Sequence, residues 1–356
     1  MKRVPADWLA RVMDGALQRR GLTAEHAGFV ADGLIEASLR GVDTHGVRLF
    51  PTYLAELDGG RSRARPEMGW LPGARAARVL DAGHALGLVA GRVACDEAVR
   101  LAREYGVGTV AVCNSNHFGP ASCYTLAMAR QGVLGLAMTN SDALVAPFQG
   151  VRPLFGTNPL SFAAAAEGED LFCADLATSQ VSYSKVKLRR ERGLPLEPGW
   201  AVTASGEDAA RTSDEVSALQ PLGGPKGQCL GMMVEILCTL LTGMPLDHEL
   251  SHLYVEPFDE PRRVGHLFLA FDVPAFTDPG TFRVRLSHLL ALVREQPGAA
   301  GERVLAPGDL ESEAAAERRE HGIPMTGAEL SRFEEIERAM GRDATECYNP
   351  PVSSES

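Results

Sequence analysis

Three short apolar runs, each bordered by polar residues, dominate the pattern of hydrophobic and polar positions along the chain. The runs cover residues 107–112, 134–138 and 160–163. They are too short and too interrupted by glycine to form helices, so the pattern predicts three buried β-strands. Residues that can form hydrogen bonds lie at the strand ends, in segments 114–119, 139–141 and 156–159. Because polar groups gathered at the ends of buried strands form binding sites, we expect a ligand there.

Helical spacing of apolar residues covers both ends of the chain. It runs from residue 6 to residue 57, where Thr23 occupies an N-cap position, and it returns between residues 279 and 340. Between these parts, strands alternate with predicted helices such as residues 89–105 and 121–131. The middle of the chain therefore has an α/β pattern.

These patterns predict an α/β domain over residues 71–284 and a discontinuous helical domain made of residues 1–70 and 285–340. Residues 341–356 are expected to form a disordered tail. Within the α/β part, residues 230–242 predict a buried helix.

A long segment without periodicity, residues 193–226, is rich in glycine and proline. Long loops in compact domains are usually binding or lid segments, so we expect this one to lie over the site. The basic cluster at residues 187–192 predicts a solvated loop, with an anion site as the alternative.

The composition restricts the class of protein. The 356 residues are 45% hydrophobic and 23% charged, an ordinary globular balance with room for two domains. The net charge of −11 argues against a nucleic-acid partner, because binding phosphates requires a basic surface.

Cysteine usage and hydropathy indicate the compartment. The seven cysteines are scattered and include no Cys-x-x-Cys, so neither a metal site nor a disulfide framework is expected, and a reducing cytoplasm fits best. The N-terminus lacks an apolar signal core, and the longest apolar run, residues 230–246, is interrupted by Glu235. We therefore expect no contact with a membrane.

Two constellations could carry chemistry. His45 and Arg48 lie three residues apart, so one helical turn would place both on one face. Arginine grips a carboxylate through two hydrogen bonds and histidine exchanges protons near neutral pH, a combination suited to an anionic acid. The alternative is an exposed pair on a surface helix. His117 is the second candidate, its alternative being a histidine that only hydrogen-bonds its own turn.

Two further positions could contact a nucleotide. Lys226 lies in a glycine-rich turn ahead of a helix, where backbone N–H groups and an ammonium suit phosphate, although a solvated lysine is the commoner outcome. Asp175, at the end of a predicted strand, could hold ribose hydroxyls or cap a helix. No Gly-x-Gly-x-x-Gly opens a helix after a predicted strand, so a dinucleotide would require a fold other than the Rossmann fold.

The chain resembles the malate/L-lactate dehydrogenase family, which is distinct from the Rossmann enzymes and includes sulfolactate, ureidoglycolate and malate dehydrogenases, diketogulonate reductase and piperideine-2-carboxylate reductase. The likeness extends from about residue 6 to about residue 337. It depends on six sequence blocks in the family's order: Thr44-His45-Gly46-Val47-Arg48, Ser115-Asn116-His117-Phe118-Gly119, Leu154-Phe155-Gly156-Thr157-Asn158-Pro159, Asp175-Leu176-Ala177-Thr178-Ser179, Gly223-Gly224-Pro225-Lys226-Gly227, and Pro307-Gly308-Asp309 leading to Arg318 and Gly322-Ile323.

The resemblance implies a homodimeric NAD- or NADP-dependent oxidoreductase of the sulfolactate dehydrogenase-like fold, with its site near the dimer interface. By this resemblance Arg48 clamps the carboxylate of a small anionic substrate, Thr44 orients His45, and either His45 or His117 transfers the proton. The positions implied to line the cofactor are His117, Phe118, Gly119, Ser141, Thr157, Asn158, Asp175, Leu176, Ala177, Lys226, Pro307, Gly308 and Asp309.

Several positions depart from the family pattern and bear on the substrate. Residues 182–184 are Ser-Tyr-Ser where the family usually has Ala-Arg-Gly, and residues 228–229 are Gln-Cys where it usually has Tyr-Gly. Lys185 matches the hydroxy-acid members, whereas cyclic-imine reductases carry aspartate there. Lys185 is therefore a candidate substrate residue that favours 2-oxo acids.

The sequence thus favours hydride transfer between a nicotinamide and C2 of a 2-oxo or 2-hydroxy acid. Three alternatives stay open: reduction of a cyclic ketimine carboxylate, a lyase with Lys226 as a Schiff-base lysine, and a non-catalytic relative that only binds the cofactor.

Overall fold

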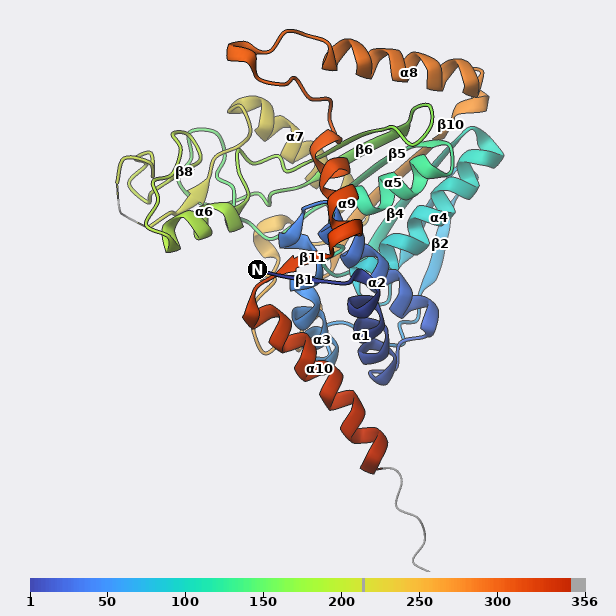
Figure 1. Ribbon diagram of the computed structural model, residues 1–356, viewed down its shortest axis with the longest axis vertical. Helices are drawn as coiled ribbons and strands as arrows, with labels where there is room; N and C mark the ends of the chain where they lie inside the picture. The colour runs from blue at the N-terminus through green and yellow to red at the C-terminus, as the bar shows by residue number, and fades with distance from the viewer. Residues whose placement is uncertain (213–214, 347–356) are drawn as a thin grey trace, which may run out of the picture. The chain divides into compact units, whose positions relative to one another are not determined.

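The computed structural model describes residues 1–212 and 215–346 (Figure 1). The chain divides into two compact units. Among the described residues, 1–54 and 311–346 form unit 1, and 55–310 form unit 2. The sequence predicted domain boundaries at residues 70 and 285. That these boundaries separate independently folding domains stays a prediction.

Unit 1 is helical and joins the two ends of the chain. Its helices are α1 (Ala6–Arg19), α2 (Ala24–Leu39), the start of α3 (Phe50–Gly59), most of α9 (Asp309–His321), and α10 (Gly327–Glu346). Strands β1 (Lys2–Val4) and β11 (Ile323–Met325) pair antiparallel. The expected helical domain from both termini is therefore confirmed. Helix α10 extends past residue 341, where the tail was expected to begin, and residues 347–356 of that tail lie outside the described residues.

Local sequence signals explain the helices of unit 1. The Thr23 side chain accepts a hydrogen bond from the backbone N–H of His26, which confirms its predicted N-cap role. In α1, Leu9, Val12 and Met13 are buried at the spacing of one helix face. Phe50 stacks on Phe333 of α10 with 5.7 Å between ring centroids, so the core of unit 1 includes side chains from both ends of the chain.

Unit 2 contains a seven-stranded sheet. In spatial order its strands are β2 (Gly69–Ala74), β3 (Ala77–Asp81), β4 (Val107–Ser115), β10 (Val264–Asp272), β5 (Val133–Thr139), β6 (Leu160–Ala165) and β7 (Leu171–Leu176). The three strands predicted from the apolar runs are β4, β5 and β6. Only β3 and β4 pair in parallel within this sheet, and the other neighbours are antiparallel.

Both faces of the central strand β10 are buried, because helices cover the sheet on both sides. Helices α4 (Gly87–Tyr105) and α5 (Ser122–Arg130) pack on one face of the sheet (Figure 1). On this face the ring of Phe268 contacts that of Tyr124 in α5. On the other face Leu267 packs against Val234 and Cys238, from α7 (Pro225–Glu235) and the π-helical turn η3 (Ile236–Leu240). This explains the continuous apolar run in β10, since each face meets a helix.

Glycines in the strands let the helices approach closely. A Cβ on Gly108 of β4 would lie 2.1 Å from the carbonyl oxygen of Ala98 in α4. A Cβ on Gly135 of β5 would lie 2.8 Å from the sulfur of Met128 in α5. The glycines that interrupt the apolar runs are therefore helix contact points.

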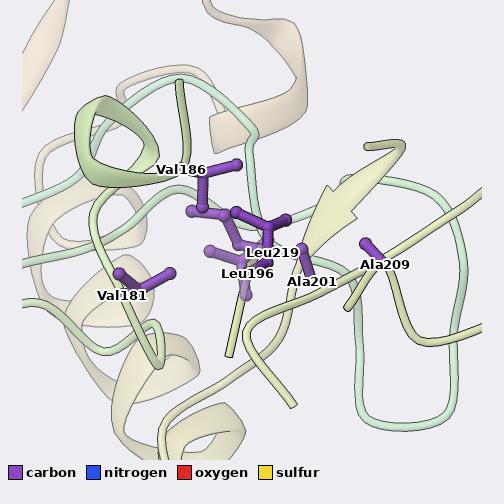
Figure 2. Close-up of a cluster of buried hydrophobic side chains, with 7 residues drawn as sticks. Val181, Val186, Leu196, Ala201, Ala209 and Leu219 are labelled. Carbon is purple, nitrogen blue, oxygen red and sulfur yellow. The ribbon is translucent and has the colours of Figure 1, made fainter. Parts of the chain in front are cut away.

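Residues between 181 and 219 form a small core together with Val145 (Figure 2). Helix α6 (Tyr183–Glu191) and the short strands β8 (Ala201–Val202) and β9 (Ala218–Leu219) contribute Val186, Ala201 and Leu219 to it. The prediction of a solvated loop at residues 187–192 was wrong, because these residues continue α6 to Glu191. The signal was Ser182, whose side chain caps α6 by accepting a hydrogen bond from the N–H of Lys185.

The remaining elements of unit 2 are η4 (Asp247–Glu249), η5 (Val273–Ala275), α8 (Pro279–Arg294) and η6 (Ala299–Gly301). No helix in residues 1–212 and 215–346 combines the length and apolarity needed to cross a membrane. The prediction of a helix over residues 230–242 agrees with the structure as far as Leu240, because α7 continues without a break into the π-helical turn η3. The prediction that this helix is buried was wrong, because one side of the segment is exposed, with Ile236 at 47% and Leu240 at 62% exposure.

Candidate functional site

The polar strand ends meet at one edge of the sheet in unit 2. Strands β4 and β5 both run antiparallel to β10, so their last residues lie at the same edge, with Ser115 opposite Val264 and Thr139 opposite His266. Strand β6 runs against β5 and begins at this edge, and β7 ends there, with Leu160 opposite Leu176. This register brings the three polar segments of the sequence to one edge of the sheet, and the expected ligand there stays a prediction.

A buried carboxylate, Asp247, connects these segments. It accepts hydrogen bonds from Asn140 Nδ2 at 3.1 Å, from Asn158 Nδ2 at 2.7 Å and from the backbone N–H of Gly156 at 2.7 Å. Burial raises the pKa of Asp247 to about 7, although the three donors favour its charged form. Asp247 therefore fixes the ends of β5 and β6 relative to each other.

Ser141 and Thr157 present hydroxyl groups beside this carboxylate. The backbone N–H of Thr157 donates to Ser141 Oγ at 3.0 Å, and the two hydroxyl oxygens lie 3.4 Å apart. Both residues are partly exposed, and each hydroxyl keeps the capacity for a further hydrogen bond. Asn158 is fully buried, and its Oδ1 accepts from the N–H of Ser141 at 3.2 Å, so its side chain supports the site instead of facing a ligand.

His266 crosses the same edge as a structural group. Its Nδ1 lies 2.7 Å from Thr139 Oγ1 and its Nε2 lies 2.8 Å from Ser115 Oγ. Burial lowers the pKa of His266 to about 3, so the ring is neutral at physiological pH and links β4 to β5 through β10.

His117 follows β4 at this edge and is partly exposed. The backbone N–H of Gly119 donates to His117 Nδ1 at 3.4 Å. In a neutral ring the proton then sits on Nε2, which can donate a hydrogen bond to an oxygen atom, whereas transfer of a proton from Nε2 requires the imidazolium form of the ring. The Phe118 ring is buried and stacks on His266 with 4.6 Å between centroids, so only its backbone could reach a cofactor.

Asp175 lies near the end of β7 and is exposed. Its Oδ2 accepts a hydrogen bond from the backbone N–H of Ser122 at 3.0 Å, at the start of α5. This is the helix-capping role that the sequence left open beside ribose binding. Leu176 and Ala177 follow it at the same edge and are partly exposed.

Lys226 occupies the first turn of α7 and is exposed. The preceding Gly223 and Gly224 have φ angles of 58° and 71°, which side-chain-bearing residues rarely adopt. A Cβ on Gly227 would lie 2.3 Å from the backbone nitrogen of Leu222. This compact glycine turn, a helix N-terminus and an ammonium group together fit the phosphates of a nucleotide.

The other four candidate positions of unit 2, in residues 185 and 307–309, are held by structural contacts. Lys185 on α6 places its Nζ 5.0 Å from the centre of the Trp200 ring, a cation–π contact. Asp309 binds Arg294 through Nη2 at 2.6 Å, and this bond lowers the pKa of the Asp309 carboxyl. The carbonyl of Pro307 accepts a hydrogen bond from the backbone N–H of Cys173 in β7 at 3.2 Å, and Gly308 is buried beside that strand.

The candidate residues of unit 1 lie on a short loop after α2. The loop consists of two 3₁₀ turns, η1 (Asp43–His45) and η2 (Val47–Leu49), with Gly46 between them at ψ −150°. The prediction that one helical turn carries His45 and Arg48 was therefore wrong. Gly46 is required there, because its Cβ would lie 2.1 Å from Ser38 Oγ.

The contacts of this loop suit an acid–base site. Thr44 Oγ1 lies 3.0 Å from His45 Nδ1, in line with the implied orienting role of this hydroxyl. Arg48 Nε forms an ion pair with Glu329 Oε1 at 2.9 Å. Arg318 of α9 holds Asp43 through Nη1 at 2.6 Å and Nη2 at 3.1 Å, which fixes the start of the loop.

Sequence reasoning missed two groups at the sheet edge besides His266. One is Asp247. The other is Asp142, which directly follows Ser141 and is ion-paired with Arg262 and with His252 Nδ1, the latter at 2.6 Å. Burial by itself would raise the pKa of Asp142, but the hydrogen bond from His252 and the charge of Arg262 outweigh burial, so the pKa is lowered.

In the part of the chain described, His, Cys, Asp and Glu form no group of three that could hold a metal ion.

The seven-stranded sheet with its polar edge is a mixed α/β fold that lacks the Rossmann fingerprint, and comparison with known proteins gives the family. A family model described as malate/L-lactate dehydrogenase matches residues 4–334. A malate dehydrogenase of Pyrococcus abyssi is 34% identical over 352 residues, which cover 95% of each chain. The chain belongs to the malate/L-lactate dehydrogenase family, and the resemblance found in the six sequence blocks is confirmed.

Two other relatives carry cofactor names. A ureidoglycolate dehydrogenase (NAD(+)) of Escherichia coli O157:H7 is 32% identical over 309 residues, 86% of this chain and 87% of the relative. A (2R)-3-sulfolactate dehydrogenase (NADP(+)) of Chromohalobacter salexigens is 35% identical over 312 residues, 86% of this chain and 89% of the relative.

Solved structures agree on the fold. The sulfolactate dehydrogenase of Methanocaldococcus jannaschii matches with a TM-score of 0.88 at 27% identity, over 95% of this chain and 97% of that one. The delta1-piperideine-2-carboxylate reductase of Pseudomonas syringae pvar. tomato matches with a TM-score of 0.83 at 29% identity, over 94% and 100%. The expected sulfolactate dehydrogenase-like fold class is thereby confirmed.

Proposed function

We propose that this protein is an NAD- or NADP-dependent dehydrogenase of small 2-hydroxy acids, working reversibly on the matching 2-oxo acids. The observation that supports it most is the row of hydrogen-bonding groups at the sheet edge of unit 2, in a chain whose relatives are named malate, sulfolactate and ureidoglycolate dehydrogenases. The acidic charge of the chain fits a small-molecule partner better than a nucleic acid.

The residues of the edge fit a pyridine nucleotide. We assign its hydroxyl and amide groups to Ser141, Thr157 and the backbone at His117 to Gly119, and its phosphates to Lys226 with the glycine turn before α7. Asp175 to Ala177 and Pro307 to Asp309 are the further proposed lining segments. When bound, the nucleotide supplies or accepts the hydride.

The substrate is held and protonated by side chains of this chain. Arg48 binds its carboxylate with a planar fork of N–H donors, which fixes the orientation of C2. Either His117, through Nε2, or His45, oriented by Thr44, gives the proton to the forming hydroxyl and takes it back in the reverse direction. Lys185, held against Trp200, is the proposed second cation for the substrate.

A second candidate reaction is the reduction of a cyclic ketimine carboxylate. The structural likeness to a piperideine-2-carboxylate reductase supports it. The imine nitrogen of such a substrate arrives already protonated, so less acid catalysis is needed. Lys185, in place of the aspartate of imine reductases, favours the oxo acid instead.

A further alternative is a Schiff-base lyase in which Lys226 forms the imine. Saturable binding of NADH or NADPH would argue against this alternative.

We also propose a homodimer in the cytoplasm. The segment from the start of α7 to residue 241 has apolar side chains that are between 40% and 62% exposed, an unusual concentration for a surface that faces only water. These are Met232, Met233, Ile236, Leu240 and Leu241. The cysteines of the described part are all free thiols, which fits a reducing compartment.

One plate of assays tests the function. Purified protein is mixed with NADH or NADPH and with each member of a panel of 2-oxo acids, which includes dicarboxylic and sulfonated acids. Piperideine-2-carboxylate is tested beside them. Turnover is followed as the loss of absorbance of the reduced cofactor. We expect turnover of at least one 2-oxo acid and its loss by about 10²-fold or more in kcat/KM in Arg48→Ala. Tight cofactor binding without oxidation across the panel would instead identify a non-catalytic relative.

A further inference from the structure

The guanidinium of Arg48 has a protein partner at one of its nitrogens. Glu329 Oε1 lies 2.9 Å from Arg48 Nε, and the side chains are 23% and 36% exposed. Among the residues described, the structure gives Nη1 and Nη2 of Arg48 no further partner. Surface ion pairs are individually weak, so this contact matters only if it controls where the guanidinium points.

Glu329 is itself fixed by the start of α10. Its Oε2 accepts a hydrogen bond from the backbone N–H of Thr326 at 2.7 Å, and its own N–H donates to Thr326 Oγ1 at 3.3 Å. This reciprocal arrangement is a capping box. The two carboxylate oxygens are thus divided, one holding the helix end and the other holding Arg48.

The backbone that carries Arg48 is also fixed. The N–H of Val47 donates to Ser38 Oγ at 2.9 Å, and Asp43 is bound by Arg318. The remaining freedom of Arg48 is in its side-chain torsions. A partner at Nε removes much of that freedom and leaves the Nη1–Nη2 edge as the pair of donors for a carboxylate.

We propose that Glu329 is a positioning residue for substrate binding: it holds the Nε side of Arg48 so that the Nη1–Nη2 edge meets the substrate carboxylate. This inference rests on the proposed role of Arg48 as the carboxylate clamp. In this proposal Glu329, which lies in α10, assists Arg48, which lies in the N-terminal part of the chain. The alternative is competition, in which the Glu329 carboxylate occupies Arg48 and excludes an anionic substrate.

Two variants separate positioning from helix capping. Glu329→Ala removes both contacts, whereas Thr326→Ala removes the threonine part of the capping box and leaves the carboxylate beside Arg48. We expect both variants to lower the melting temperature. Only Glu329→Ala should raise the KM for the 2-oxo acid, by about 10-fold, with kcat and the KM for the reduced cofactor nearly unchanged, because the clamp acts alike in the ground and transition states.

The outcomes are distinct. An unchanged KM in Glu329→Ala, or an equal rise in both variants, overturns the proposal, since the carboxylate then serves the helix alone. A lower KM in Glu329→Ala overturns it too and identifies Glu329 as a competitor of the substrate. If the wild-type protein turns over no acid of the panel, the proposed function fails and this inference falls with it, a result recognisable before any variant is made.

Discussion

Asn158 Nδ2 lies 2.7 Å from Asp247 Oδ2, and this hydrogen bond joins the turn before β6 to a segment far along the chain. Asn158 also donates to the carbonyl of Gly231 at 3.1 Å and has a φ of 36°. One amide thus connects β6, α7 and the buried carboxylate, and it holds the two hydroxyls of Ser141 and Thr157 in place.

The first prediction concerns this amide. Asn158→Ala removes one donor from Asp247 Oδ2 and the acceptor of the Ser141 N–H. We expect this loss to lower the free energy of unfolding by about 1–3 kcal/mol. We expect weaker binding of the reduced cofactor as well, measured by calorimetry. Gln131→Ala, on the exposed end of α5, is the control and should change neither quantity. Normal cofactor affinity in a destabilised Asn158→Ala protein would show that the hydroxyls do not depend on this bond.

The second prediction is a pH dependence of stability. Asp247 has a folded-state pKa of about 7 and a reference value of 3.8, so between these pH values the folded protein binds more protons than the unfolded chain. The contribution of this group to stability is therefore full below about pH 4 and is lost as pH rises to about 7, by at most about 1.4 kcal/mol per pH unit.

Urea unfolding at pH 5 and pH 8 tests this for the wild type and Asp247→Asn. The variant should be less stable at both pH values, because its new amide N–H₂ faces that of Asn140. Its stability should nevertheless fall less between pH 5 and pH 8 than that of the wild type. Equal falls in the two proteins would mean that Asp247 does not titrate in this range.

The third prediction decides between the two histidines. His117→Gln and His45→Gln are made singly, and the one that transfers the proton should lose about 10²–10⁴-fold in kcat while still binding the cofactor. His288→Gln, on the exposed face of α8, is the control for a general loss of imidazole. If both variants keep the wild-type kcat, proton transfer belongs to another group.

The fourth prediction concerns the loop that carries His45 and Arg48. Gly46→Ala drives a Cβ to within 2.1 Å of Ser38 Oγ and 3.0 Å of its backbone nitrogen, and the Val47 N–H then loses its acceptor. We expect a loss of about 1–3 kcal/mol in stability and a raised KM for the acid. Gly28→Ala, in the interior of α2 with open space around its Cβ, should instead stabilise by about 0.5–1 kcal/mol.

Much of the architecture follows from local patterns. The apolar runs predict β4, β5 and β6 because each strand is short, buried and bounded by polar residues, and Thr23 marks the start of α2 by its own side chain. The strand ends collect at one edge because β10 lies between β4 and β5. That last step is not visible in the sequence, since it depends on the pairing of distant strands.

The missed site residues share a physical reason. Asp247 and His266 look like isolated polar residues in the sequence, because their partners at Asn158 and Thr139 lie far away along the chain. Gly46 divides what looks like one helical turn, because Ser38 occupies the space of a Cβ. The sequence pattern shows that residues 230–242 are mostly apolar, but it does not show which side of this segment packs against the rest of the protein. Contacts made by tertiary structure decide all of these features.

The position of β10 has a consequence for how the molecule is made. Strands β4 and β5 leave the ribosome early but do not pair with each other, since the strand of residues 264–272 inserts between them. A nascent chain that lacks this strand has two unpaired strand edges, and the polar ends of β4 and β5 are not yet aligned. The proposed cofactor site can therefore form only after residues 264–272 have been synthesised.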